Sequence, residues 1–219
     1  MLWQSWTYEG KNMPEIQSIE YSQDYFIEIE KKLRKKLSEK RFRHTLGVAN
    51  TAANMAMVHG EDVSRAYLAG LLHDNAKCID SDKKIRLCEK YGLSISKTER
   101  ENPELLHAKL GSYLAKKNYQ VKDEEILSAI ACHTTGKPEM TVLEKILFVA
   151  DYIEPTRKMI PNLQVVREAA FIDLDKAVLL ELHGTLNYIK NKAAATDDIT
   201  LETYHYYKAK DAGKVLEAI

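Results

Sequence analysis

Apolar residues recur every three to four positions along almost the whole chain, and sustained alternation of apolar and polar residues is nearly absent. The first pattern is typical of α-helices that turn one face toward a core, whereas the second would indicate β-strands. The sequence therefore predicts an all-α fold, a single compact multi-helix bundle. The predicted helices cover residues 24–58, 63–77, 81–91, 103–118, 123–133, 141–153, 163–170, 173–192 and 200–218.

No internal repeat or low-complexity linker interrupts this succession of helices, so residues 25–219 are expected to form one domain. Residues 1–24 lack the helical pattern and contain Gly10 and Pro14, which predicts an irregular N-terminal extension. A chain of 219 residues with 45% hydrophobic and 29% charged residues is long enough to bury one sizeable core.

The charge balance and the apolar runs exclude several classes of partner. Lys plus Arg (32) equals Asp plus Glu (32), so no overall field attracts nucleic acid or an anionic membrane. The N-terminus lacks the features of a secretory signal peptide, and no run of about 18 apolar residues occurs. We therefore expect a cytoplasmic protein that binds neither nucleic acid nor membrane. Cys78, Cys88 and Cys132 are odd in number and lack a Cys-x-x-Cys spacing, which predicts reduced thiols.

Six ionisable residues stand on helix faces that otherwise carry apolar side chains. His44, for example, shares a helical face with Val48 and Ala52. The four histidines continue such stripes, Asp74 stands beside His73, and Asp151 closes an apolar run, so all six are expected to point into the core. These residues are His44, His73, Asp74, His107, His133 and Asp151.

Burying four imidazoles and two carboxylates costs roughly a few kcal/mol for each unpaired group, unless the groups satisfy one another or a cation. A bound metal ion would satisfy the whole set. Imidazoles and carboxylates are ligands that iron, manganese, cobalt and zinc accept. Because none of the six residues is a cysteine, the set favours an open catalytic site over a closed structural one. His59 is expected to be an ordinary helix-end residue, and His183 and His205 are expected in packing or surface positions.

The order of these residues resembles that in the HD-domain metal-dependent phosphohydrolases. A lone His44 is followed about 30 residues later by the adjacent pair His73 and Asp74, and then by Asp151 at the end of a hydrophobic helix. Longer segments are similar to the YqeK branch of that superfamily, the symmetrical diadenosine tetraphosphate hydrolases of bacteria. They are RFRHTLGVA at 41–49, AGLLHDNAK at 69–77 and HTTGKPEMTVLEKILFVADYIEPTR at 133–157, within a resemblance that covers roughly residues 25–207.

This resemblance implies a centre of two transition-metal ions, most often iron, with manganese or cobalt as alternatives. One ion would be held by His44, His73, Asp74 and Asp151. Asp74 would bridge to a second ion held by His107 and His133. Six protein ligands cannot saturate two six-coordinate ions, so positions stay open for water and phosphate oxygens, as hydrolysis requires.

The residues expected around this centre are cationic, hydroxyl-bearing or small, and suit a polyphosphate. Lys77 lies one turn after His73, and Arg157 follows Asp151 by six residues, so both are expected to reach bound phosphates. The predicted substrate-binding residues are Arg41, Lys77, Thr134, Thr135, Gly136, Lys137 and Arg157. The predicted catalytic residues are His73, Asp74 and Lys77.

The predicted function is hydrolysis of a nucleoside polyphosphate, namely symmetrical cleavage of diadenosine tetraphosphate to two ADP by a metal-activated water. Metal ligands report the reaction type better than the base, so a phosphohydrolase of mononucleotides is an alternative. A metal-bound nucleotide sensor without turnover is another. The sequence leaves open which metal is physiological and whether the chain forms a homodimer.

Overall fold

The computed structural model describes residues 21–192 and 196–217. All regular elements in that part of the chain are helical, and the predicted all-α fold is confirmed. The elements are α1 (Gln23–Lys36), α2 (Glu39–His59), α3 (Val63–Leu72), α4 (Ser81–Lys90), α5 (Lys97–Glu101), the 3-10 turn η1 (Pro103–Leu105), α6 (Leu106–Tyr119), α7 (Glu124–Cys132), α8 (Val142–Ile153), α9 (Leu163–Ala170), α10 (Leu174–Asn191) and α11 (Asp198–Glu217). Residues 1–20 of the predicted N-terminal extension lie outside the described residues.

The prediction of one continuous helix over residues 24–58 is wrong, because α1 and α2 are separate helices. Between them Ser38 is extended, with φ −64° and ψ 154°, and its side chain accepts a hydrogen bond from the backbone N–H of Arg41. Serine is a favourable N-cap, because its hydroxyl satisfies an otherwise unpaired N–H at the helix start. Leu33 and Leu37 before the break and Phe42 after it are all buried, so the apolar pattern continues across the break and conceals it.

Two further differences from the prediction are the end of α3 and the presence of a short helix, α5. The helix predicted over residues 63–77 ends at Leu72, and the chain continues as turns from His73. The five-residue α5 was not predicted at all, because so short a segment shows too little periodicity. It forms through a capping box in which the side chains of Ser96 and Glu99 each accept a hydrogen bond from the other residue's backbone N–H.

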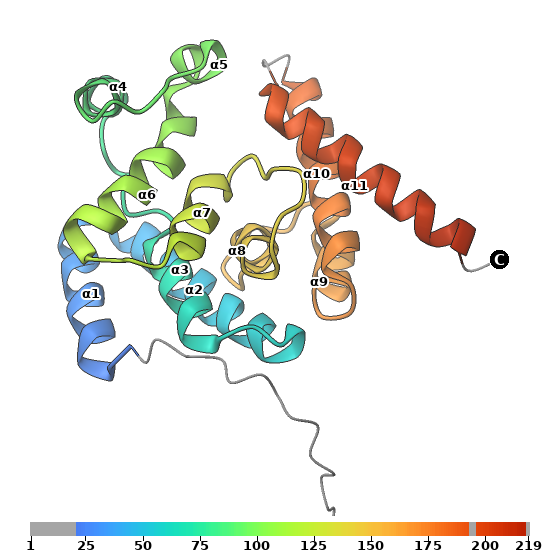
Figure 1. Cartoon of the computed structure of the whole chain (residues 1–219), viewed down its shortest axis with the longest axis horizontal. Helices are drawn as coiled ribbons and strands as arrows, with labels where there is room; N and C mark the ends of the chain where they lie inside the picture. Colours follow the sequence, from blue (N-terminus) through green and yellow to red (C-terminus); the bar gives the residue numbers. More distant parts are fainter. Residues whose placement is uncertain (1–20, 193–195, 218–219) are drawn as a thin grey trace, which may run out of the picture.

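Helices α2, α3, α7 and α8 pack against one another at the centre of the molecule (Figure 1). Helix α6 packs on α7, and α4 packs on the outer side of α6. On the other side, α10 contacts α8, α9 and α11. The main core includes Val48, Leu68, Ile130 and Ile146, all fully buried. Other helices therefore pack against the central helices on both sides. The central helices carry His44, His133 and Asp151.

All three cysteines are free, as predicted; Cys88 and Cys132 are buried and Cys78 is exposed. Tyr207 packs in the core and its hydroxyl accepts a hydrogen bond from the backbone N–H of Met140. Across the described residues, none of the helices has the length and apolar character needed to traverse a membrane.

The backbones of α2 and α3 approach closely at Gly70. A Cβ atom added to Gly70 would lie 2.5 Å from the Cα atom of Ala49 and 2.9 Å from its backbone nitrogen. Backbone atoms cannot rotate away as a flexible side chain can, so only glycine fits here. The close approach also positions the turn that follows α3, because the carbonyl of Gly70 contacts the His73 ring.

We expect Gly70→Ala to lower the free energy of unfolding by about 1–3 kcal/mol, because the two helix backbones would have to separate. Gly111→Ala is the matched control, since the nearest atom to its added Cβ is 3.4 Å away. A helical glycine replaced by alanine also gains up to about 1 kcal/mol in helix propensity. Chemical denaturation measures both variants, and equal losses would contradict the assignment of a close backbone contact.

Candidate metal centre

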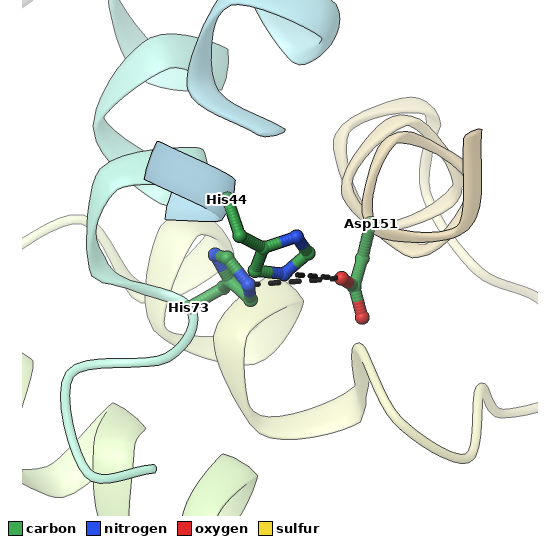
Figure 2. Close-up of side chains that lie close together, drawn as sticks. All are labelled: His44, His73 and Asp151. Atoms are coloured by element: carbon green, nitrogen blue, oxygen red, sulfur yellow. Dashed lines mark ion pairs between the residues drawn. The ribbon is translucent and has the colours of Figure 1, made fainter. Parts of the chain in front are cut away.

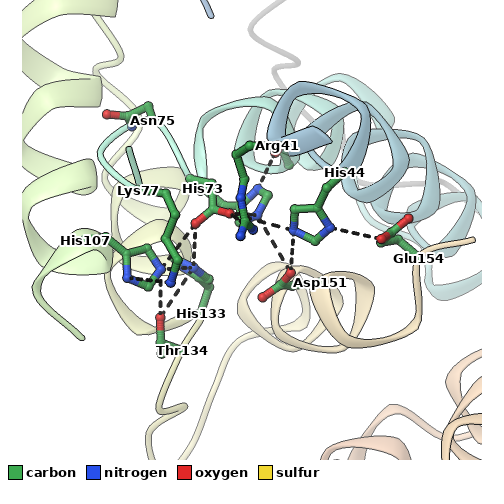
Figure 3. A network of polar contacts seen from close by, with 12 residues as sticks. Arg41, His44, His73, Asn75, Lys77, His107, His133, Thr134, Asp151 and Glu154 are labelled. Atoms are coloured by element: carbon green, nitrogen blue, oxygen red, sulfur yellow. Dashed lines mark hydrogen bonds and ion pairs between the residues drawn. The ribbon is translucent and has the colours of Figure 1, made fainter. Parts of the chain in front are cut away.

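The structure brings together all six residues that the sequence singled out as inward-pointing. They come from five segments that are distant in the sequence and meet between the central helices (Figure 3). The residues are His44 on α2, His73 and Asp74 in the turn after α3, His107 in the first turn of α6, His133 at the C-cap of α7, and Asp151 on α8.

Each histidine is oriented through its Nδ1 atom. Three of them contact the backbone carbonyl three residues earlier: His73 Nδ1 lies 2.7 Å from Gly70 O, His133 Nδ1 lies 2.7 Å from Ile130 O, and His107 Nδ1 contacts Glu104 O. A carbonyl only accepts, so each of these Nδ1 atoms carries a proton and each Nε2 is left for another partner. The fourth ring, His44, places Nδ1 3.0 Å from Oε1 of Glu154. All four Nε2 atoms therefore face inward as potential ligands.

The first group of ligand atoms is formed by His44, His73, Asp151 and one oxygen of Asp74. Oδ1 of Asp151 lies 3.0 Å from His44 Nε2 and 3.8 Å from His73 Nε2 (Figure 2). Oδ2 of Asp74 lies 3.3 Å from His73 Nε2 and 3.7 Å from His44 Nε2. Both Nε2 atoms are buried and have no hydrogen-bond partner. An unpartnered buried lone pair is costly, and a metal ion would satisfy it.

The second group is formed by His107, His133 and the other oxygen of Asp74. The two Nε2 atoms lie 3.1 Å apart. Two ligand nitrogens, each about 2.1 Å from one ion and at right angles, would be about 3 Å apart. Oδ1 of Asp74 lies 3.3 Å from His107 Nε2 and 4.0 Å from His133 Nε2. Asp74 therefore turns one oxygen to each group of histidines, the arrangement of a carboxylate that bridges two ions.

Burial keeps the second pair of imidazoles neutral. Burial, followed by the charge of His133, lowers the pKa of His107 to about 3. Burial, followed by the charge of His73, lowers the pKa of His133 to about 4. Burial alone would raise the pKa of Asp74, but the charge of His73 outweighs it and holds that pKa well below its ordinary value. Neutral imidazoles beside an ionised carboxylate are the ligand forms that bind transition metals.

Three predicted substrate-binding cations border these groups. Arg41 donates a 2.6 Å hydrogen bond to Oδ2 of Asp74, and Arg157 donates to both the backbone oxygen and Oδ1 of Asp151. Lys77 Nζ lies 3.4 Å from His107 Nδ1 on the opposite side (Figure 3). Burial lowers the pKa of Lys77.

The residues of the segment after α7, 134–137, differ in what they contact. Thr134 Oγ1 lies 3.4 Å from Nε2 of both His107 and His133, so it borders the second group directly. Thr135 follows and is partly exposed. Gly136 instead supports the fold, since its φ of +66° is in the left-handed region and an added Cβ would lie 2.9 Å from the Thr203 side chain. Lys137 pairs with the buried carboxylate of Glu144 at 2.6 Å.

The other histidines occupy ordinary positions, as expected. His59 Nε2 lies 2.7 Å from the backbone oxygen of Ala170 at the end of α2. His183 contacts Asn187 on the same helix at 3.0 Å, and both His183 and His205 are exposed.

Glu154 is a residue that the sequence reasoning missed. It is 1% exposed and accepts hydrogen bonds from the N–H and the hydroxyl of Thr156, while its Oε1 orients His44. The hydrogen bonds from His44 and Thr156 outweigh burial and lower its pKa, so it is a carboxylate. Gly47 makes room for it, because an added Cβ there would lie 2.5 Å from Glu154 Oε2. The signal in the sequence was a glutamate three residues after Asp151, before a proline that ends the helix.

Comparisons with known proteins show the family of this chain. The model of the HD domain matches residues 41–156. The symmetrical bis(5′-nucleosyl)-tetraphosphatase of Halalkalibacterium halodurans is 40% identical over 77% of this chain and 89% of its own length. The protein of that name from Bacillus subtilis is 37% identical over 80% of this chain and 92% of its own.

A solved structure is similar as well. The crystal structure of a predicted HD superfamily hydrolase involved in NAD metabolism, from Clostridium acetobutylicum, superposes with a TM-score of 0.82 at 38% identity. It covers 84% of this chain and 97% of that protein.

A helical bundle closed around buried histidines and aspartates defines a class of metal-binding helical domains. This chain belongs to the HD domain family, together with the relatives named symmetrical bis(5′-nucleosyl)-tetraphosphatase. The resemblance found in its sequence is thereby confirmed.

We expect Glu154→Ala to lower the metal affinity of the centre about ten- to a hundredfold, because His44 would lose the group that fixes its tautomer and ring orientation. Glu154→Gln should lose less, since an amide oxygen still accepts from Nδ1. Elemental analysis after dialysis against graded chelator measures the affinity. Glu168→Ala, at an exposed position on α9, is the control. If Glu154→Ala retained metal as well as Glu168→Ala does, the orienting role would be wrong.

Proposed function

We propose that this protein is a metal-dependent hydrolase that cleaves diadenosine tetraphosphate at its centre to give two ADP. The observation that carries the proposal is the position of Asp74, whose two oxygens face two separate groups of histidines. Paired metal sites of this kind serve displacement reactions at phosphorus. The name shared by the relatives supports the substrate and the symmetry of cleavage.

We assign one ion to His44, His73, Asp74 and Asp151, and the second ion to Asp74, His107 and His133. We propose iron as the metal, with manganese or cobalt as alternatives. When bound, such ions lower the pKa of a water molecule and neutralise charge on the attacked phosphate. The chain's own part is to hold the four Nε2 atoms and an ionised Asp74 in a fixed arrangement, and the Nδ1 hydrogen bonds fix the direction of the rings.

We propose that Arg41 and Arg157 bind the phosphates of one nucleoside diphosphate half of the substrate. Both line a cavity of about 480 Å³ that also includes His44 and Tyr152. A planar guanidinium presents paired donors that match phosphate oxygens, so each arginine can exchange its carboxylate contact for a phosphate contact. Lys77 and Thr134 would meet the phosphates beyond the scissile bond, because they border the second group of histidines.

We expect ADP as the only nucleotide product from diadenosine tetraphosphate. If one nucleoside diphosphate half is held beside Arg157, the attacked phosphorus is the second from that end, and water attack there releases two identical diphosphates. Chromatography of the products from metal-replete protein measures this.

Other product patterns would contradict the proposal. Equimolar ATP and AMP would rule out symmetrical cleavage. Release of phosphate from mononucleotides, without cleavage of the tetraphosphate, would favour a mononucleotide phosphohydrolase. Tight nucleotide binding without any turnover would favour a sensor.

We expect about two transition-metal ions per chain in protein prepared without chelator, and we expect Asp74→Ala to lose both metal and turnover. His73→Ala should abolish turnover while retaining more metal, because His73 is assigned to one ion only. His183→Ala is the control, because this histidine is exposed and its contacts are with Asn187 and the Tyr204 ring, away from the ligand groups. Elemental analysis and turnover are measured on the same samples, and a loss of metal in His183→Ala equal to that in His73→Ala would refute the ligand assignment.

A further inference from the structure

A second cavity, of about 250 Å³, lies at the end of the centre away from Arg41 and Arg157. It is enclosed by α5, α6, the C-terminal end of α7 and the start of α11. Its lining includes Ser96, Leu105, Lys109, Ala131, Thr134 and Ile199. The cavity near Arg41 and the second cavity share no lining residue.

Thr134 connects the second cavity to the metal centre. It lines the cavity, and its Oγ1 lies 3.4 Å from Nε2 of His107 and of His133. At the opposite end, His44 lines the cavity that contains Arg41 and Arg157. Figure 3 shows Thr134 and His107 at one end of the array of polar residues and His44 and Glu154 at the other. The two cavities therefore adjoin opposite ends of the same centre.

The two cavities differ in charge. The first is lined by four cations, Lys40, Arg41, Arg157 and Lys158, and suits phosphates. The second is lined by one lysine and two carboxylates. The lysine, Lys109, is paired with Glu99 at 2.8 Å, and the second carboxylate, Asp197, makes this cavity less suited to phosphates.

The walls of the second cavity suit an uncharged ring system. Leu105, Ala108, Ala131 and Ile199 supply apolar surface, and Ser96 and Thr135 supply hydroxyl groups. Ligand pockets typically combine apolar walls with a few polar groups, and drug-sized ligands occupy about 300–1,000 Å³. A cavity slightly below that range fits one nucleoside and is too small for a whole dinucleotide.

We infer that the second cavity binds the second nucleoside of a dinucleoside polyphosphate, the one attached beyond the scissile bond. This inference rests on the proposed function. The first cavity then holds one nucleoside diphosphate, the metal centre lies at the middle of the polyphosphate, and the second nucleoside enters between α5, α7 and α11. Two separate nucleoside subsites at opposite ends of one centre account for a cut in the middle of the substrate.

Narrowing the second cavity tests the inference. Ala131 is exposed on α7 and lines this cavity, so Ala131→Trp fills it without displacing core residues. Ile199→Trp narrows the same cavity from α11 and lies far from the metal ligands in the sequence. Ala209→Trp, at an exposed alanine on α11, is the matched control.

Two ligands are compared with metal-loaded enzyme. One is diadenosine tetraphosphate, and the other is adenosine 5′-tetraphosphate, which has the same phosphates but lacks the second nucleoside. We expect Ala131→Trp and Ile199→Trp to raise KM for diadenosine tetraphosphate about ten- to a hundredfold. The inhibition constant of adenosine 5′-tetraphosphate should change less than about twofold, since its nucleoside can occupy the first cavity. Metal content should be unaltered, and Ala209→Trp should change neither ligand.

The outcomes separate this inference from the proposed function. Wild-type protein that does not convert diadenosine tetraphosphate to ADP refutes the proposed function. Wild-type protein that does so, with KM unchanged in both cavity variants, refutes only the second subsite. An equal weakening of both ligands also refutes it, because the cavity would then serve the phosphates rather than the second nucleoside.

Discussion

The structure depends on the burial of four imidazoles and Asp74 within one helical core, with Asp151 half-buried beside them. Each imidazole has two nitrogens, and both need a partner once water is excluded. The protein satisfies the outer nitrogen with a fixed acceptor and directs the inner one toward Asp74 or Asp151. The helix boundaries follow from this requirement, since α3 and α7 both end where a histidine turns back to a carbonyl of its own helix.

Much of this arrangement could be predicted from the sequence because apolar periodicity reports which side of a helix is buried. A polar residue on an apolar stripe, such as His44 or His107, is therefore visible without a structure. The break at Ser38 was not visible, because buried apolar residues lie on both sides of it, Leu33 before it and Phe42 after it. Glu154 was missed for a different reason: its partner His44 lies 110 residues away, and no local pattern reports a contact of that separation.

Two arginines, Arg41 and Arg157, offset the negative charge of the two aspartates of the centre. Arg41 contacts Asp74 and Arg157 contacts Asp151, so each carboxylate of the centre has a guanidinium beside it. These contacts keep the cations at the edge of the ligand cluster without burying an uncompensated charge. The same two side chains line the larger cavity, which joins the metal centre to a region suited to phosphates.

The use of backbone carbonyls to orient three of the four histidines has an evolutionary consequence. Replacing the side chain of Glu104 or Ile130 does not remove the carbonyl that holds His107 or His133, so a substitution there leaves the hydrogen-bond acceptor of the ring in place. His44 has no such protection, because its acceptor belongs to the side chain of Glu154. Mutational robustness is therefore uneven around the centre, and His44 is the ring that can lose its hydrogen-bond acceptor through one side-chain substitution elsewhere in the chain.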